Sequence, residues 1–470
     1  MGVESGRVVK WGYLISTSSD DCVSAINEYY DQVLSYGRER SVILDAVKLD
    51  ESCVLANVLA AHFLCSYDPS RVPARVRAAE DHLDQSTPYE KAVYNAIRSL
   101  ISENRDNDVA FEEHRKLLAE YPKDLVSLKR AQILCFYMGQ PDLSLNLVEQ
   151  ILPQNAEESY IYGMLAFPLL ELGRMDDAEK ASKKAFEINN RDCWAQHNLC
   201  HVYQYNCQLK DAVEFMEKCA PTWSSCSSFM ITHNWWHVAL CYLEGSAQIS
   251  KVLDIYDSHI WKELERPDAV NPEVYLNALG LLLRLSLRDH TNSFGDRLNV
   301  LASCVEKKEN WYIEWHLDIL IIWALAFSGK LSVAEELLDN LKSRFSLMNK
   351  KKQLTMQQAI LLAEAMYEFG NGHYKQGLDM LGLDFDAISC KRIGASDEQL
   401  DVFNEVYYSM LLNTGQVKKA TEAIEKRVKK TDASPFLWHL LERCYRQAGR
   451  VTEAEAANKK VRALETAAGL

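Results

Sequence analysis

Residues 159–226 contain the pattern that decides the fold. They read SYIYGMLAFPLLELGRMDDAEKASKKAFEINNRD (159–192) and CWAQHNLCHVYQYNCQLKDAVEFMEKCAPTWSSC (193–226). The two segments are equally long, and each has an alanine, Ala178 or Ala212, at its twentieth position. A small side chain at a fixed point of a repeating unit allows two helices to cross closely. The pattern therefore predicts a helical hairpin that repeats along the chain.

The same register extends toward the N-terminus. Ala110 and Ser144 precede Ala178 at the interval that separates Ala178 from Ala212, and Gly139 and Gly173 fall where each hairpin has to turn. This interval matches the period of a tetratricopeptide repeat, in which each repeating unit is a hairpin of two helices. We therefore predict four repeats, which are residues 91–124, 125–158, 159–192 and 193–226.

A second run of repeats closes the chain. Ala420 and Ala454 are separated by the same interval, and Gly415 and Gly449 stand at their turns. Between the two runs the register survives with insertions, because residues 233–266 and 315–348 each fit one unit less well. We predict four regions, which are an N-terminal helical region (1–90), four repeats (91–226), divergent helical repeats (227–400) and two C-terminal repeats (401–470).

The predicted fold class is all-α, an α-solenoid of tetratricopeptide-like helical hairpins that form a right-handed superhelix with a concave groove. Composition supports this, because the 470 residues include only 19 glycines and 11 prolines, about half the usual share. Folds rich in β-turns need more of both residues.

Charge and hydropathy exclude several classes of partner. The net charge is −14, which repels phosphate backbones, so nucleic acid is excluded as a partner. The longest apolar run, Ile319–Phe327, is half of what a membrane span needs, so we expect no membrane insertion. The 13 cysteines show no disulfide framework, and we interpret them as reduced thiols of a cytoplasmic protein.

Histidines gather at the positions that should face the groove. In such a hairpin, positions 2, 5, 9 and 12 of the first helix line the concave surface. His197 and His201 occupy positions 5 and 9 of one unit, and His237 and Glu244 occupy positions 5 and 12 of the next. The candidate binding residues of the groove are His197, His201, His233, Trp236, His237, Glu244, Arg284, His316 and Asp401.

Three interpretations of these histidines remain open. They can be structural, each bonded to a neighbouring helix. They can bind a peptide or a small anionic ligand, with histidines and Arg284 as donors and tryptophans as walls. They can also form a metal or acid–base centre, because two His-x-x-x-His pairs near Glu244 have ligand-compatible spacing.

Sequence motifs for common chemistries are missing. The sequence has no phosphate-binding Gly-x-x-x-x-Gly-Lys loop and no Gly-x-Ser-x-Gly elbow. The Lys and Asn clamp that some tetratricopeptide proteins use for a chaperone tail is absent too, since Asn95 and Ser99 in one unit are followed by Lys129 and Ile133 in the next. We predict no catalytic residues, no metal and no cofactor.

Three histidine-bearing segments resemble a known family. Asp192-Cys193-Trp194-Ala195-Gln196-His197, His233-Asn234-Trp235-Trp236-His237 and Tyr256-Asp257-Ser258-His259-Ile260 are similar to the tetratricopeptide repeat protein 38 family, as is Arg392-Ile393-Gly394-Ala395-Ser396 with Gln399 and Asp401. The resemblance implies a helical repeat protein with histidine-rich segments and no assigned activity. Gln204 stands where the family has Glu, Asn277 where it has Asp, and Leu400 where it has Arg.

These departures remove polar groups that a catalytic centre would need. We therefore favour an interaction protein that binds a peptide or protein partner through a groove lined by His and Trp. A small-molecule-binding protein or an enzyme that uses the same histidines is the alternative.

Overall fold

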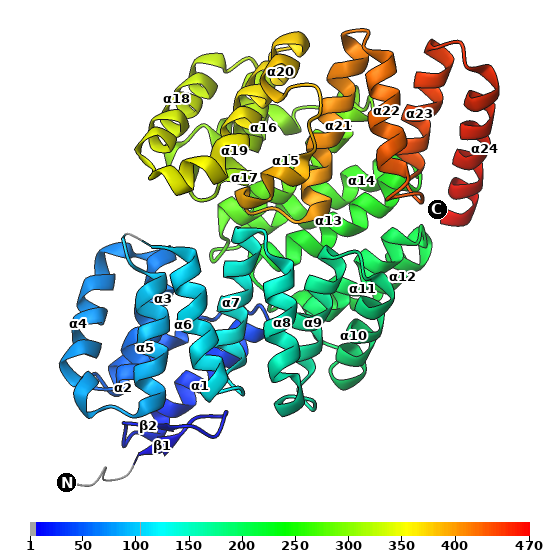
Figure 1. Ribbon diagram of the computed structural model, residues 1–470. Helices are drawn as coiled ribbons and strands as arrows, with labels where there is room; N and C mark the ends of the chain where they lie inside the picture. Colours follow the sequence, from blue (N-terminus) through cyan, green and yellow to red (C-terminus); the bar gives the residue numbers. More distant parts are fainter. Residues whose placement is uncertain (1–5, 104) are drawn as a thin grey trace. The chain divides into compact units, whose positions relative to one another are not determined.

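The computed structural model describes residues 6–103 and 105–470. These residues form two compact units. Unit 1 comprises Met1–Asn198 with Ser225–Ser227, and unit 2 comprises Leu199–Ser224 with Ser228–Leu470. Figure 1 shows the helices coloured along the chain. The division into four regions that we predicted from the repeats stays a prediction.

Unit 1 begins with an antiparallel pair of two-residue strands, in which Arg7 pairs with Ile15 and Val8 with Leu14. These strands were not predicted. Helices follow in short hairpins. The elements are β1 (Arg7–Val8), β2 (Leu14–Ile15), α1 (Asp20–Leu34), α2 (Val42–Leu49), α3 (Val54–Tyr67), η1 (Pro69–Arg71), α4 (Val72–His82), η2 (Leu83–Gln85), α5 (Pro88–Leu100), α6 (Asn107–Glu120), α7 (Leu125–Met138), α8 (Pro141–Ile151), η3 (Leu152–Gln154), α9 (Ser159–Glu171), α10 (Met175–Ile188) and the start of α11 (Cys193–Tyr205).

Unit 2 continues in the same style with helices of more varied length. Its further elements are α12 (Leu209–Cys219), η4 (Ala220–Trp223), α13 (Ser228–Glu244), α14 (Ile249–Ile255), the π-helical turn η5 (Tyr256–Ile260), η6 (Trp261–Glu265), α15 (Asn271–Leu287), η7 (Thr291–Ser293), α16 (Arg297–Val305), η8 (Lys308–Asn310), α17 (Trp315–Phe327), α18 (Leu331–Leu347), α19 (Lys350–Gly370), α20 (Tyr374–Leu381), η9 (Ala387–Ile393), α21 (Asp397–Asn413), α22 (Val417–Val428), α23 (Pro435–Gln447) and α24 (Val451–Ala468).

The repeat register appears directly in the helix boundaries. First helices begin at Leu125, Ser159 and Cys193, which are evenly spaced along the chain and coincide with the predicted unit starts. Gly139 and Gly173 turn the first two hairpins in the left-handed backbone region, with φ of 64° and 72°. Without a Cβ, glycine adopts this region at no steric cost. The prediction of an all-α solenoid of tetratricopeptide-like hairpins is confirmed.

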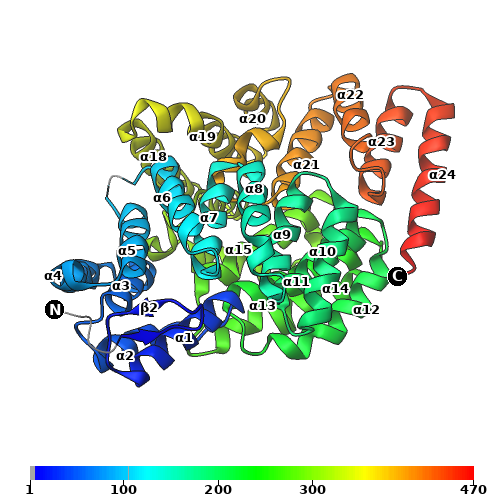
Figure 2. The same cartoon turned by 60° about the horizontal axis from the view of Figure 1, so that its bottom comes forward.

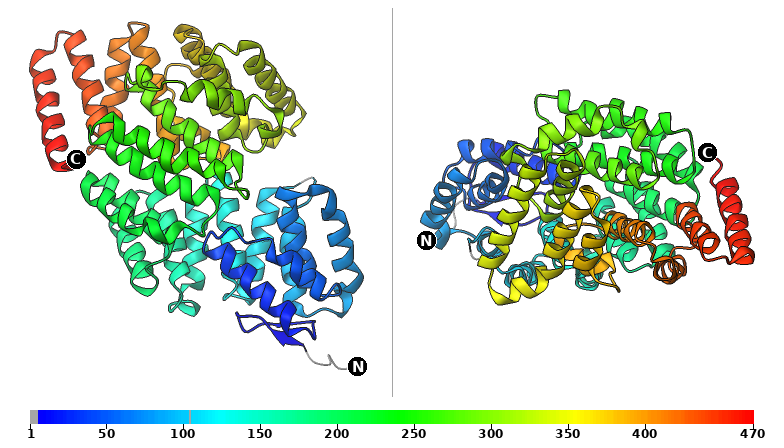
Figure 3. Two further views of the ribbon diagram at one scale, coloured as in Figure 1. Left: turned by 180° about the vertical axis from the view of Figure 1, so that it is seen from behind. Right: turned by 90° about the horizontal axis from the view of Figure 1, so that it is seen from above.

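Packing within each unit follows the hairpins. In unit 1, α9 packs on α10, and α7 packs on α8. In unit 2, α21 to α24 follow one another as neighbouring helices, with α23 and α24 as a long antiparallel pair (Figures 2 and 3). Ala178 and Ala212 are both fully buried, as the close crossing of two helices requires.

The apolar run Ile319–Phe327 forms most of α17, whose residues from His316 to Ala326 are all buried. This helix packs against α15, α16, α18 and α19. The run is therefore the core of unit 2. Among the described residues, the helices all fall short of the length and apolar content that crossing a membrane requires.

Candidate functional site

Four helices of unit 2 contribute to one polar cluster. The C-terminal half of α11 supplies two of its side chains, α13 supplies two, α15 supplies two, and the first turn of α21 supplies one carboxylate. We call it the histidine–glutamate network, and its members are His201, Gln204, His233, His237, Asn277, Arg284 and Glu398. Four of these residues were predicted as site residues. Gln204, Asn277 and Glu398 were not.

Glu398 is the centre of the network. His201 Nδ1 lies 2.9 Å from its Oε2 atom, and Gln204 Nε2 donates to its Oε1 atom over 3.1 Å. His237 Nδ1 lies 3.5 Å from the same Oε2 atom. The side chain of Glu398 is 24% exposed and that of His201 15% exposed, whereas His237 is fully buried. One carboxylate therefore connects the surface of unit 2 with its buried histidines.

The position of Glu398 on its helix favours the ionised form. Ser396 caps α21 by accepting from the backbone N–H of Gln399, and the Gln399 side chain accepts from the backbone N–H of Ser396. Glu398 thus lies in the first helical turn, where the helix dipole favours negative charge. Burial alone would raise the pKa of Glu398, but His201 and the Arg284 guanidinium outweigh burial and hold that pKa below its usual value.

Arg284 holds the start of α21 in place. Its guanidinium donates to the backbone carbonyl of Glu398 over 2.5 Å and lies 5.0 Å from the centre of the Trp236 ring. Trp236 in turn stacks on His233, with ring centres 5.1 Å apart. A cation over an aromatic face is stabilised by the ring quadrupole. Arg284 and Trp236, both predicted as site residues, therefore position the network.

The two inner histidines bond to side-chain amides. His237 Nδ1 lies 2.9 Å from Gln204 Oε1, and His233 Nδ1 lies 2.9 Å from Asn277 Oδ1. The Asn277 amide nitrogen donates to Thr232 and Glu273, which leaves its oxygen as the acceptor for His233. Both histidines therefore carry a proton on Nδ1 and donate to an amide oxygen.

Burial keeps His233 and His316 neutral. Desolvation lowers the pKa of His233 to about 4, against the opposing effect of the hydrogen bond to Asn277. Desolvation and the nearby charge of Arg284 lower the pKa of His316 to about 3. His316 lies on α17 with its ring against Phe403 of α21, so it packs on the network without bonding to it. At neutral pH these rings carry no charge.

Two predicted site residues belong to separate ion pairs of unit 2. Glu244 pairs with Arg288 over 3.1 Å and accepts from Ser434 and from the backbone of Phe436, so it caps α23. Asp401 pairs with Arg427. Burial raises the pKa of Asp401 to about 6 in spite of this pair. Neither carboxylate contacts the histidines.

His197 lies in unit 1, since that unit ends at Asn198. Its buried ring stacks on Trp194 at 4.6 Å with an angle of 9° between the planes. The sequence placed His197 and His201 on one helical face, and they do share α11. His197 is described with unit 1 and we assign it no part in the network of unit 2.

The network offers the donor types of a metal site, because imidazole nitrogens and a carboxylate are ligands that zinc prefers. In unit 2 the Nδ1 atoms of His201 and His237 and the Glu398 carboxylate already take part in hydrogen bonds. His201 Nδ1 and Gln204 Nε2 lie at hydrogen-bonding distance from Glu398, and His237 Nδ1 bonds to Gln204. The observed geometry is therefore that of a closed hydrogen-bonded network.

Comparison with known proteins finds distant similarity to solved structures. No family model matches the sequence. Similar solved structures include the human IFIT1 dimer with m7Gppp-AAAA, which is 15% identical with a TM-score of 0.39 and covers 95% of this chain and 91% of that one. The human IFIT1 dimer with PPP-AAAA is 13% identical, also with a TM-score of 0.39, and covers 95% of both chains. The tetratricopeptide-like fold of the present chain follows from its own helix boundaries.

The exclusion of nucleic acid as a partner is wrong. The similar IFIT1 structures contain m7Gppp-AAAA and PPP-AAAA, which are nucleic acids. We had based the exclusion on the net charge of the whole chain, which averages over local differences. Unit 2 illustrates this point, since Lys419, Lys426, Arg427 and Lys430 gather around a single cavity.

Proposed function

We propose that the protein is a non-catalytic binding protein of the tetratricopeptide-like class. A peptide or protein partner binds unit 2 at the exposed edge of the histidine–glutamate network, which consists of His201, Gln204 and Glu398. The observation that carries the proposal is the Glu398 side chain, which stays ionised, is 24% exposed although its Oε2 atom is buried, and is held in place by four helices. A partner that donates hydrogen bonds, such as a basic or amide side chain, suits this acceptor.

Preorganisation supports binding at this point. Glu398 is held through its side chain by His201 and Gln204 and through its backbone by Arg284. A carboxylate that is already ordered loses little conformational entropy when a partner binds. His237 then has a positioning role, since it bonds to the Gln204 side chain, and His233 does the same for Asn277.

The same features argue against acid–base catalysis by His233 and His316. A general acid or base works best when its pKa lies near the operating pH. The pKa values of His233 and His316 lie at about 4 and about 3, so both rings stay neutral where such an enzyme would need them to exchange protons.

The resemblance to the tetratricopeptide repeat protein 38 family agrees with binding. Where that family has Glu and Asp, this chain has Gln204 and Asn277, and both amides accept hydrogen bonds from buried histidines. A neutral amide leaves its histidine uncharged, whereas a carboxylate would favour the charged imidazolium. We propose that this chain is a member of that family in which the histidine cluster is structural. The 13 free cysteines support a reducing location such as the cytoplasm.

Quantitative affinity capture tests the proposal. The full chain, tagged, is compared with Glu398→Gln and His201→Gln, and with Glu455→Gln on the exposed face of α24 as the matched control. We expect at least one partner to be recovered about tenfold less well with both site variants and unchanged with the control. Thermal melting of each variant shows whether the fold is intact.

Equal recovery of every protein by the four chains contradicts the proposal. A metabolite that raises the melting temperature of the wild type and not of Glu398→Gln would instead support the alternative, in which the network holds a small molecule.

A further inference from the structure

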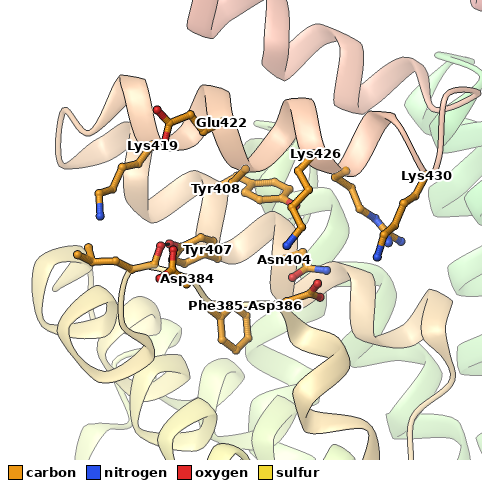
Figure 4. A pocket seen from close by; sticks show the side chains of 13 residues that line it. Asp384, Phe385, Asp386, Asn404, Tyr407, Tyr408, Lys419, Glu422, Lys426 and Lys430 are labelled. Atoms are coloured by element: carbon orange, nitrogen blue, oxygen red, sulfur yellow. Dashed lines mark hydrogen bonds between the residues drawn. The ribbon is translucent and has the colours of Figure 1, made fainter.

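A second feature of unit 2 lies apart from the histidine–glutamate network. A cavity of about 200 Å³ opens between the loop after α20, one face of α21 and one face of α22 (Figure 4). Its lining comes from these three elements and comprises Leu383, Asp384, Phe385, Asp386, Asn404, Tyr407, Tyr408, Lys419, Glu422, Ala423, Lys426, Arg427 and Lys430.

Local structure builds each wall. Gly382 ends α20 with φ of 78°, so the chain leaves the helix in a direction that other residues rarely allow. The Asp386 side chain then caps η9 by accepting from the backbone N–H of Ile388. The Tyr407 hydroxyl donates to the carbonyl of Leu383 over 2.6 Å. The loop is therefore tied to α21 at a fixed distance.

The two walls differ in net charge, since the α22 wall carries four cationic side chains and one carboxylate, Glu422, and the loop carries two aspartates. Lys419, Lys426 and Lys430 follow one another at intervals of seven and four residues, which places them on one side of α22 and its end. Within residues 6–103 and 105–470, the three ammonium groups form no ion pair. Asp384 and Asp386 lie on the opposite wall, and Figure 4 shows lysine side chains reaching from α22 toward the loop.

Aromatic side chains complete the cavity between these walls. Tyr407 and Phe385 lie with ring centres 5.5 Å apart, and Tyr407 and Tyr408 with ring centres 6.2 Å apart. Tyr408 is almost fully buried, so it belongs to the base of the cavity. An apolar group of a ligand would bury its surface against these rings.

Charge and size together define the ligand. A simple anion would be attracted by the lysines but repelled by the two aspartates. A simple cation would be attracted by the aspartates but repelled by the lysines. A zwitterion satisfies both walls at once. The volume of about 200 Å³ lies below the roughly 300–1,000 Å³ of sites for drug-sized molecules. We propose that this cavity binds a free α-amino acid with an apolar side chain.

In this site Lys426 and Lys430 bind the carboxylate, Asp384 and Asp386 bind the ammonium group, and the side chain packs on Tyr407, Tyr408 and Phe385. Charge-assisted hydrogen bonds at both ends provide the selectivity. An analogue that lacks one charged group leaves the opposite wall unpaired and should bind much more weakly.

Isothermal titration calorimetry on the full chain tests the site. L-leucine, L-methionine and L-phenylalanine are the probes, with 3-phenylpropionate and phenethylamine as analogues that lack the amine or the carboxylate. We expect saturable binding of at least one amino acid, and binding at least tenfold weaker for each analogue. Lys426→Gln and Asp386→Asn should each weaken binding about tenfold, whereas Lys459→Gln, exposed on α24, should not.

The inference is overturned if none of the three amino acids binds at concentrations up to about 10 mM. It is also overturned if 3-phenylpropionate binds as tightly as L-phenylalanine, or if the cavity variants bind like the wild type. Glu398→Gln should leave amino acid binding unchanged, so failure of this site and failure of partner binding at the network are separate results.

Discussion

The hairpin of α9 and α10 and the pair of α13 and α15 illustrate two ways to bury a helix. Where α9 meets α10, the buried residues are apolar or small, such as Ala166, Ala178 and Ala181. Helices α13 and α15 also bury apolar residues, but they bury His233, His237 and Arg284 with them. Packing alone explains the first hairpin, whereas the second pair needs every polar group to find a partner.

This difference indicates where a functional site can lie. Burying a polar group destabilises a protein unless its hydrogen bonds are made, and the only hydroxyl groups that α9 and α10, both fully described, bury are those of Ser159 and Ser182. The α13 and α15 pair keeps several polar groups, and His233, His237 and Arg284 among them belong to the histidine–glutamate network. The α9–α10 hairpin therefore serves as scaffold, whereas α11, α13, α15 and α21 provide the candidate site.

The largest effect on stability is expected when the ion pairs of α15 are broken. Arg288 pairs with Glu405 and Glu244 and lies 3.7 Å from the centre of the Phe436 ring. Arg288→Met leaves two carboxylates without their cation and should lower the free energy of unfolding by about 3 kcal/mol. Urea denaturation measures this, with exposed Arg443→Met as the control. A loss as small as that of the control would contradict the account of α15.

Overpacking the regular hairpin comes next. Ala178 is fully buried where α9 and α10 cross. Ala178→Leu adds three carbon atoms to a packed interface and should lower the free energy of unfolding by about 2 kcal/mol. Lys184→Leu, exposed on the same helix, is the control for hydrophobicity and should change stability little. If both variants behave alike in urea denaturation, the crossing is not close-packed.

In the core of unit 2, a buried carboxyl group should make the free energy of unfolding depend on pH. Burial raises the pKa of Asp318 to about 7, although the backbone N–H of Tyr312 donates to it. Between about pH 4 and pH 7 the folded protein therefore keeps a proton that the unfolded chain has lost, so stability falls as the pH rises. This pH dependence should disappear in Asp318→Asn.

Urea denaturation at several pH values checks this prediction. The difference in stability between Asp318→Asn and the wild type should grow as the pH rises and then level off above about pH 7. A difference that is constant with pH would show that the carboxyl group ionises normally in the folded protein.

The smallest effect concerns the turn of the regular hairpin. A Cβ on Gly173 would meet no atom within 4 Å, so only its φ of 72° resists substitution. Gly173→Ala should therefore destabilise the protein by about 1 kcal/mol. Gly173→Asn should cost less, because asparagine tolerates this backbone region. Equal melting temperatures for the wild type and Gly173→Ala would show that the positive φ at this position imposes no strain on alanine.

The regular hairpins could be predicted because local signals agree with tertiary packing. Ala178 and Ala212 mark close crossings, and Gly139 and Gly173 mark turns with positive φ. In the divergent region, helices begin or end a few residues away from the positions that the repeat register predicts. The first helix of the unit predicted at 233–266 begins at Ser228, and its second helix ends early in a π-helical turn.

The site could be predicted only in part. Periodicity placed His201 and His237 at inward positions, and both are in the network. It could not bring in Glu398, which is 194 residues from Gln204, because no local pattern encodes that contact. The Ser396-x-x-Gln399 capping box was the available signal, since it places Glu398 in a first helical turn. Glu244 and Asp401 were expected in a groove, but the structure uses them in ion pairs with Arg288 and Arg427.

The central claim is that His233 and His316, the buried histidines at and beside the network, stay neutral and have a structural role. Nuclear magnetic resonance titration of the imidazole nitrogens tests it most directly, with His233→Gln and His316→Gln to assign the signals. The account predicts that both rings remain neutral as the pH falls from about 8 to about 5, since their pKa values are about 4 and about 3. Titration of either ring with a midpoint near 6.5 would contradict it and return these histidines to the acid–base interpretation.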